Sequence, residues 1–262
     1  MKHANNLTLL LASFSLPSAQ QLASAAARKG WKSYALDETP NVPITGPRTF
    51  YGGSDRAAEH AARFELSLIE PPLDLLARVP ANLLARTVRF GTLAKMRHLP
   101  GPIFIKPADP ILRNFDAGVH RSVADVRGRT AIDEQTLVLV SEPVEWTAEY
   151  RCFIRERKVA AWSPYLSFGR PVWKPGSAGE LPANLAAFCQ RLVTHMEQIL
   201  PPAFVVDVGV LDDGRWAVVE FNPAWCSSIL GANVENVLTV IERAATWSRD
   251  LRKQDLPWVR LG

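Results

Sequence analysis

The amino-acid sequence predicts an α/β (α+β) protein, in which a small parallel α/β lobe precedes a larger region of hairpins and helices. Residues 1–70 alternate short apolar runs with helical stretches, the pattern of parallel strands joined by helices. From residue 102 onward, apolar runs of strand length are separated by tight turns and by one strongly amphipathic helix. The 262 residues allow one large domain or two to three lobes with a sizeable core.

The first unit reads as strand, helix and strand, over residues 7–13, 18–28 and 31–36. Gly30 suits the end of the helix. The alternative is a secretory signal, because an early lysine precedes an apolar run and Ala-x-Ala spacing. Two serines interrupt that run, which favours the strand–helix–strand interpretation.

The following segments extend this pattern. Residues 48–53 predict a strand, 54–64 a helix that begins at Ser54, and 65–70 a short strand. Residues 71–98 are predicted to be helical, including the stretch "ANLLARTVRFGTLAKM". The runs "PIFIKPAD" and "TLVLVSEPVEW" predict two further strands.

The second half of the chain predicts two hairpins and two helices. One hairpin covers residues 149–165 and turns at Glu156-Arg157. The helix in 178–199 carries a core stripe formed by Leu185, Phe188, Leu192, Met196 and Ile199. The second hairpin has strands at about 203–211 and 216–222, and a last helix is predicted over 232–251.

The composition excludes several classes of protein. Thirty basic against 26 acidic residues give a net charge of +4, which suits an anionic ligand, and no dense Lys/Arg run indicates nucleic acid. Three cysteines lie far apart in the sequence without a zinc spacing, which predicts a reduced cytoplasmic protein. No apolar run approaches the ~20 residues that span a membrane.

The second hairpin places two carboxylates within apolar strands. A two-residue turn at Asp213-Gly214, or a four-residue loop, puts Asp207 directly opposite Glu220, with Asn222 on the same face. A three-residue loop would break this register. We call Asp207 and Glu220 the acidic pair. The other face is predicted to pack on a core through Phe204, Val206, Val208, Val210, Ala217, Val219 and Phe221.

The acidic pair needs a compensating cation, because like charges directly opposite each other on a sheet repel. Carboxylate and amide oxygens are hard ligands that suit magnesium. Gly209 lies on the same face and is expected to leave room above the strand. The alternative is a solvated surface face with no metal.

Three further features predict contacts with a nucleotide. Lys106 lies inside an apolar strand, where it needs an anion unless it is an edge lysine that reaches water. Arg151 is either a phosphate ligand or a surface strand residue. Residues 141–144, "SEPV", end a strand and expose backbone groups that could read an adenine edge; the alternative is a plain β-turn. We call them the hinge segment.

The sequence lacks the motifs of two common nucleotide-binding classes. It contains no GxxxxGK[ST], so it is not a P-loop protein, and it lacks the HRD and DFG motifs of ordinary protein kinases.

The stretches "PIFIKPAD…FDAGV", "LVLVSEPVEWTAEYRCFI" and "VVDVGV…VVEFNPAW" together resemble the ATP-grasp superfamily. More narrowly, they are similar to its divergent clade named for an arginine and two lysines. That clade includes the eukaryotic cell-division-cycle protein that helps assemble a translation initiation factor. The resemblance covers residues 80–235 and implies an ATP-grasp fold, with the nucleotide between two α+β lobes. The implied domains are a pre-grasp lobe at 1–75, an N-terminal lobe at 76–140 and a C-terminal lobe at 141–262.

The resemblance also implies the roles of individual residues. Lys106 would hold phosphates and Arg151 would meet the transferring phosphate, which makes these two the catalytic candidates. Ser141, Glu142 and Val144 would contact adenine, and Asp207, Glu220 and Asn222 would hold Mg²⁺. The clade's second lysine is missing from "PILRNF", so Arg113 would replace it. Either Arg86 or Arg89 would be the clade's arginine.

The function implied is an ATP- and magnesium-dependent ligase that activates a carboxylate as an acyl phosphate for attack by an amine. The unknown carboxylate and amine substrates include a peptide or protein as one option, and no nucleic acid or membrane partner is expected. The alternative is an ATP-binding protein-assembly factor with little or no turnover. The aromatic stretch 162–173 would border the substrate or partner site, or pack as a loop on the sheet.

Overall fold

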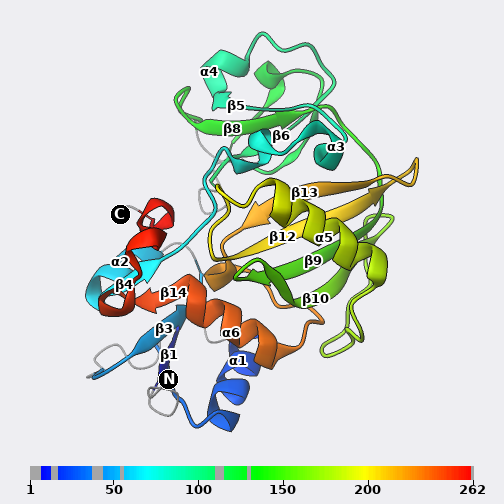
Figure 1. The fold of residues 1–262 in the computed structure, drawn as a ribbon. Coiled ribbons are helices and arrows are strands. Elements are labelled where there is room, and N and C mark those ends of the chain that lie inside the picture. Colours follow the sequence, from blue (N-terminus) through cyan, green and yellow to red (C-terminus); the bar gives the residue numbers. More distant parts are fainter. Residues whose placement is uncertain are drawn as a thin grey trace.

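The protein forms three groups of strands and helices, which Figure 1 shows one above another. The arrangement is taken from a computed structural model. It describes residues 7–12, 17–36, 44–53, 56–109, 115–128 and 131–260. Ser54 and Arg113, which the sequence singles out, lie outside the described residues. The three predicted domains and the two boundaries between them stay predictions.

The first lobe has a three-stranded parallel sheet in the order β2-β1-β3. Its strands are β1 (Thr8–Leu11), β2 (Lys32–Ala35) and β3 (Arg48–Tyr51). Helix α1 (Pro17–Arg28) connects β1 to β2 and buries its alanine-rich face with Leu22. The strand–helix–strand interpretation of this segment is therefore confirmed.

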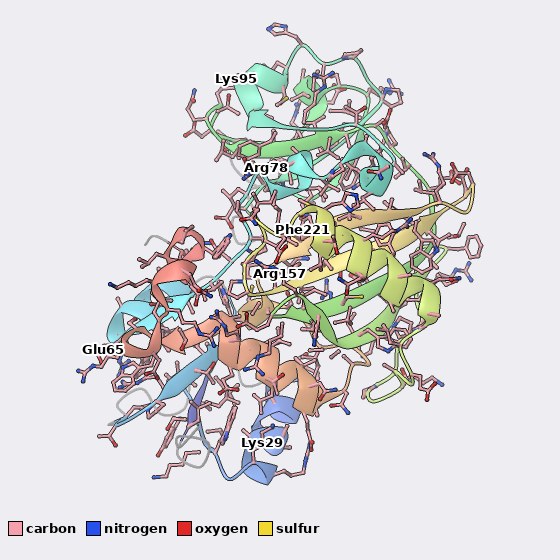
Figure 2. All side chains as sticks on the ribbon, in the orientation of Figure 1. Lys29, Glu65, Arg78, Lys95, Arg157 and Phe221 are labelled. Atoms are coloured by element: carbon pink, nitrogen blue, oxygen red, sulfur yellow. The ribbon has the colours of Figure 1, made fainter. Side chains whose placement is uncertain are left out.

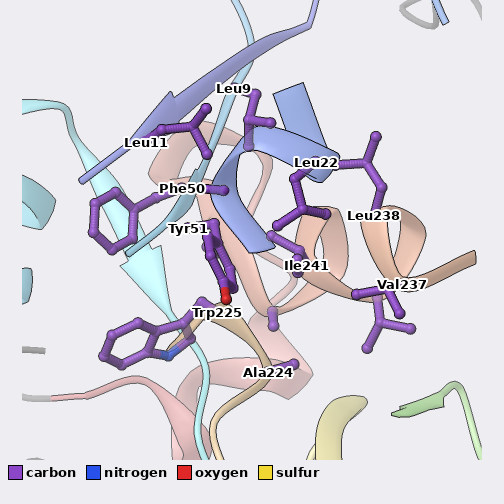
Figure 3. Close-up of a cluster of buried hydrophobic side chains, with 14 of the residues drawn as sticks. Leu9, Leu11, Leu22, Phe50, Tyr51, Ala224, Trp225, Val237, Leu238 and Ile241 are labelled. Carbon is purple, nitrogen blue, oxygen red and sulfur yellow. The ribbon is translucent and has the colours of Figure 1, made fainter. Parts of the chain in front are cut away.

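The C-terminal part of the chain returns to this first lobe. Helix α6 (Val234–Ala244) packs against α1, and the buried side chains around both form one core (Figure 3). The chain then forms β14 (Ala245–Trp247), which pairs antiparallel with β4 (Leu66–Leu68) beside α2 (Ala57–Arg63). The prediction of one helix over 232–251 is wrong, because Thr246 and Trp247 pair with β4 instead of continuing the helix.

A second lobe contains a four-stranded antiparallel sheet in the order β5-β8-β6-β7. Its strands are β5 (Val88–Thr92), β6 (Ile103–Pro107), β7 (Gly118–His120) and β8 (Leu137–Ser141). The helical prediction for residues 71–98 is wrong in its central part. The short helices α3 (Ala81–Leu84) and α4 (Leu93–Met96) flank β5, whose alternating β-branched and aromatic residues pair along β8.

The third lobe is a five-stranded antiparallel sheet in the order β11-β10-β9-β12-β13. Its elements are β9 (Trp146–Arg155), β10 (Lys158–Ser167), β11 (Arg170–Pro171), α5 (Ala183–His195), β12 (Ala203–Leu211) and β13 (Trp216–Asn222). Short 3₁₀ turns complete the chain at η1 (Leu75–Arg78), η2 (Val123–Asp125), η3 (Ala224–Cys226), η4 (Ser248–Asp250) and η5 (Lys253–Trp258). Among the described helices, none has the length and apolar character needed to cross a membrane.

Two predictions for this sheet are confirmed. The β9–β10 hairpin turns at Glu156 and Arg157, which both have positive φ, as a type I′ turn requires. Helix α5 covers one face of the sheet through Leu185, Phe188 and Leu192. Phe221, labelled in Figure 2, packs against the same core from β13.

Asp207 pairs with Glu220 in the β12–β13 hairpin, as predicted, but the loop and the register of the hairpin differ from the prediction. Its loop has three residues, because the Leu211 N–H donates to the Arg215 oxygen over 2.9 Å and Gly214 has φ of +82°. Val208 pairs with Val218, whereas Asp207 pairs with Glu220. A β-bulge therefore adds one residue to β13 and restores the register that the loop would have broken.

Because of the bulge, the predicted apolar face of β13 is wrong at two positions, Ala217 and Val219. Val218 packs with Val206 and Val208 in the core beneath α5, a position that the regular register gave to Val219. Ala217 is buried but belongs to no part of that core, and Val219 is half-buried.

Gly209 leaves no open room above the strand, contrary to the prediction. A Cβ atom at this position would collide with Cε3 of Trp146 and lie 2.9 Å from the Ala148 carbonyl oxygen. Glycine is therefore required so that the Trp146 indole can lie directly on β12.

We expect Gly209→Ala to lower the free energy of unfolding by about 1–3 kcal/mol, since the added methyl group overpacks a site bounded by backbone. Urea denaturation measures the change. Gly179→Ala is the matched control, because a Cβ there meets nothing within 4 Å. Equal stability of the two variants would contradict the close contact with Trp146.

Candidate functional site

The acidic pair lies on the face of the third-lobe sheet that is opposite α5. Asp207 is 1% exposed, and Arg151 on the neighbouring strand β9 forms two parallel hydrogen bonds with it. Arg151 Nε donates to Oδ1 over 2.9 Å and Nη2 donates to Oδ2 over 2.7 Å. This fork geometry fixes both side chains, and Arg151 also donates to the Ser228 carbonyl over 3.2 Å.

Glu220 is held from the second lobe. Lys106 reaches from β6 and forms an ion pair with Glu220 Oε2, and Asn222 Nδ2 donates to Oε1 over 2.8 Å. The Lys106 side chain is 16% exposed, so the strand lysine is neither a snorkelling edge residue nor unpaired. The structure thus brings together Lys106, Arg151, the acidic pair and Asn222.

The two carboxylates differ in how strongly they favour ionisation. In Glu220, burial opposes the charged form, but the Lys106 charge and the hydrogen bonds from Lys106 and Asn222 outweigh it and lower the pKa. In Asp207, burial and the neighbouring charge of Glu220 raise the pKa despite Arg151. An additional cation beside Asp207 would favour its charged form.

A third carboxylate, Glu149, lies on the same face and was missed by the sequence predictions. It precedes Arg151 by two residues on β9 and pairs with Gly209 of β12. Burial, followed by the charges of the acidic pair, raises its pKa to about 7. Its position could have been found from the two-residue period of a strand, because Glu149 and Arg151 must share a face.

An apolar cavity of about 280 Å³ lies between the second and third lobes. All four residues of the hinge segment line it, together with Phe104, Leu139 and Trp146. Lys106 and Glu220 line it as well. The hinge segment and charged groups of the site therefore line the same cavity.

The Glu142 side chain has a partner close to the hinge segment. Its Oε1 accepts a hydrogen bond from the Thr87 backbone N–H over 2.5 Å, and the residue is exposed. Ser141 is buried at the end of β8, and Val144 is half-buried. Within the hinge segment, the groups that could face a base are therefore backbone atoms and the Val144 side chain.

The structure distinguishes the two candidate arginines. Arg86 lines the apolar cavity, donates to the carbonyls of Val218 and Val219, and stacks on Trp146 at 5.2 Å. Burial lowers its pKa to about 10, which still leaves it charged at neutral pH. Arg89 is exposed on β5. Arg113 lies outside the described residues, so its predicted role stays a prediction.

A second cavity of about 760 Å³ is also lined by Glu220, and we call it the polar cavity because many of its lining residues are polar. It is bounded by Arg151 and Asn222 from the third lobe and by residues of α1 and β3 from the first. Its further lining includes Ser18, Tyr51, Trp173, Ser227 and Ser228. Trp173 ends the aromatic stretch 162–173, whereas no sequence signal identified Ser18 or Tyr51.

The oxygen donors predicted to hold a metal are the acidic pair and the amide of Asn222. No group of three His, Cys, Asp or Glu side chains in the described ranges is arranged to hold a metal ion. Two carboxylates and an amide nevertheless fit magnesium, which takes few protein ligands and keeps several waters. Each carboxylate now contacts a cationic side chain, so metal binding requires other anions for Lys106 and Arg151.

We expect Glu149→Gln to become more stabilising as pH rises from 4.5 to 8. The folded-state pKa of Glu149 is raised, so its ionisation destabilises the fold progressively between its ordinary value and about 7. Glutamine removes this penalty, and the stability difference between variant and wild type should grow by about 2–3 kcal/mol.

Urea denaturation in EDTA at several pH values measures this difference. Glu145→Gln, at an exposed position next to β9, is the control. A pH-independent effect of Glu149→Gln would contradict the assigned environment, in which Arg151 and the acidic pair face this carboxylate.

Comparisons with known proteins concern the fold and the family of the chain. The chain resembles the crystal structure of D-cycloserine synthetase DcsG with a TM-score of 0.57 and 15% identity, over 91% of this chain and 99% of that one. A RimK domain ATP-grasp protein from Sphaerobacter thermophilus gives a TM-score of 0.49 and 19% identity, over 90% and 97% of the two chains. No curated protein matches the sequence.

Residues 83–240 match the family described as "ATP-grasp domain, R2K clade family 2". The predicted relation to the eukaryotic cell-division-cycle protein is not among these matches and stays a prediction. The family match covers more than half of the 262 residues, and the likeness to DcsG is one of fold. The chain therefore has the ATP-grasp fold and belongs to the ATP-grasp superfamily, in R2K clade family 2.

Proposed function

We propose that this protein is an ATP- and magnesium-dependent ligase that joins a carboxylate to an amine. The observation that carries the proposal is the position of Glu220, which lines both the apolar and the polar cavity. A charged site between an apolar cavity and a larger polar one suits a nucleotide whose phosphates meet a second substrate.

The apolar cavity is proposed to hold adenine. Its volume and lining suit a flat heterocycle, with backbone groups of the hinge segment available to its polar edge. The phosphate chain would then extend toward Lys106 and Glu220, which line the same cavity. The clade's arginine is proposed to be Arg86, the one that lines this cavity.

Magnesium is proposed to be held by Asp207, Glu220 and Asn222. When bound, it would neutralise charge on the β- and γ-phosphate oxygens. Lys106 and Arg151 would leave their present carboxylate partners and contact phosphate oxygens, so that two side-chain cations oppose the negative charge that develops during transfer.

The chemistry needs no nucleophile from the protein. A substrate carboxylate attacks the γ-phosphorus, ADP leaves, and an acyl phosphate forms. An amine then attacks the acyl carbon, phosphate leaves, and the nitrogen loses a proton to give the amide. The polar cavity, bounded by Arg151 and Asn222, is the proposed place for the carboxylate and the amine.

We expect ATP and Mg²⁺ together to raise the thermal unfolding temperature more than either alone. A ligand at ~100 times its dissociation constant adds ~2.7 kcal/mol of stability. The double variant Asp207→Asn, Glu220→Gln should lose the metal-dependent part of the shift. Differential scanning calorimetry measures it against each variant's own baseline.

Asp213→Asn is the matched control, because Asp213 is exposed in the turn of the same hairpin and pairs with Arg215. Its shift should equal that of wild type. If millimolar Mg²⁺ and ATP leave the unfolding temperature of the wild type unchanged, the proposed nucleotide site is wrong.

Turnover separates the ligase from the alternative, an ATP-binding assembly factor. We expect ADP and phosphate release to require a carboxylate and an amine together, because the acyl phosphate must form and then be captured. Coupled assays over a panel of amino acids and peptides measure this release. ATP binding without turnover, accompanied by a stable protein complex, would favour the assembly factor instead.

A further inference from the structure

The β-bulge in β13 determines whether the acidic pair forms. Between the three-residue loop and the bulge, Val208 pairs with Val218. Continued without the bulge, that ladder would place Val219 opposite Asp207. The extra residue, Val219, moves Glu220 into this position.

Arg86 contacts the bulge in a way that a regular strand would not allow. Its Nη1 donates to the Val218 carbonyl over 2.6 Å and its Nη2 donates to the Val219 carbonyl over 3.0 Å. In a regular strand, successive carbonyls point to opposite edges, so one guanidinium could not receive both. The bulge turns two successive carbonyls toward the same side, where the fork of Arg86 satisfies them.

The Arg86 side chain is itself held from two directions. Nη1 also donates to the Leu84 carbonyl over 3.2 Å, and the guanidinium stacks on the indole of Trp146. Trp146 in turn lies on Gly209 of β12. The bulge is therefore fixed against β12, β9 and the segment before β5.

We propose that Arg86 is a positioning residue that holds the β13 bulge and thereby sets Glu220 opposite Asp207. This proposal rests on the proposed function only in treating the acidic pair as metal ligands. Because Arg86 and Val219 also line the apolar cavity, the same contact links the adenine end of the site to the metal end.

An experiment can distinguish the positioning role of Arg86 from a direct contact between Arg86 and the nucleotide. Isothermal titration calorimetry gives the affinity for ATP in EDTA and in Mn²⁺, and the ratio of the two is the metal coupling. Loss of a cavity wall would weaken ATP binding in both conditions. Loss of the bulge should reduce the metal coupling itself, by about tenfold or more in Arg86→Met, which corresponds to about 1.4 kcal/mol.

Deletion of Val219 supplies the decisive second variant. Without the extra residue, the ladder that pairs Val208 with Val218 continues regularly into the pair of Asp207 with Glu220. Arg86 is then no longer needed for the register. We expect Arg86→Met combined with this deletion to recover metal coupling to within about threefold of wild type, and Arg89→Met, at an exposed position on β5, to leave it unchanged.

The outcomes separate the two proposals. Wild type that does not bind ATP would overturn the proposed function. Wild type that binds ATP with metal coupling, while Arg86→Met retains that coupling, would overturn the positioning role alone. In the remaining outcome, Arg86→Met loses metal coupling or fails to fold, and the Val219 deletion is then added to it. Recovery of metal coupling in the combined variant supports the positioning role of Arg86, and lack of recovery overturns it.

Discussion

The ion pair between Lys106 and Glu220 is the contact on which the candidate site depends. Lys106 belongs to the four-stranded sheet of the second lobe, whereas Glu220 belongs to the edge strand of the third. Both residues line the apolar cavity, whose walls come from the two lobes. Beside Glu220, Arg151 and Asp207 form a nearly inaccessible pair within the third-lobe sheet. Two carboxylates can therefore face each other on adjacent strands because each already has a cation.

The sequence predicted which residues meet in this site, but it did not predict the strand register that brings them together. Asp207 and Glu220 were expected to pair, and they do, but the regular register behind that expectation is absent. A three-residue loop and a one-residue bulge compensate for each other. Strand periodicity cannot reveal a bulge, since the deciding contact comes from Arg86, 132 residues away from Val218 in sequence. The space expected above Gly209 is filled by Trp146, again a residue distant in sequence.

Predictions of local structure failed where pairing with distant strands overrode local preference. Residues 88–92 were predicted to belong to a helical stretch, yet they form β5 because β8 offers a partner along the whole segment. Likewise α6 ends at Ala244 because the next residues pair with β4. Segments with strong period and clear ends, such as α5 and the β9–β10 hairpin, were predictable from the chain itself.

The ion pairs of Lys106 with Glu220 and of Arg151 with Asp207 also imply that metal and phosphate bind together. On the proposed function, phosphate alone would attract Lys106 away from Glu220 and leave a largely buried carboxylate without a cation. Metal alone would do the reverse, since Lys106 would lose its anion within an apolar strand. A metal-bound phosphate replaces both partners at once, because its metal faces the carboxylates and its oxygens face Lys106 and Arg151. Binding of the two ligands should therefore be mutually dependent, and the dependence arises from the exchange of partners and requires no change in the fold.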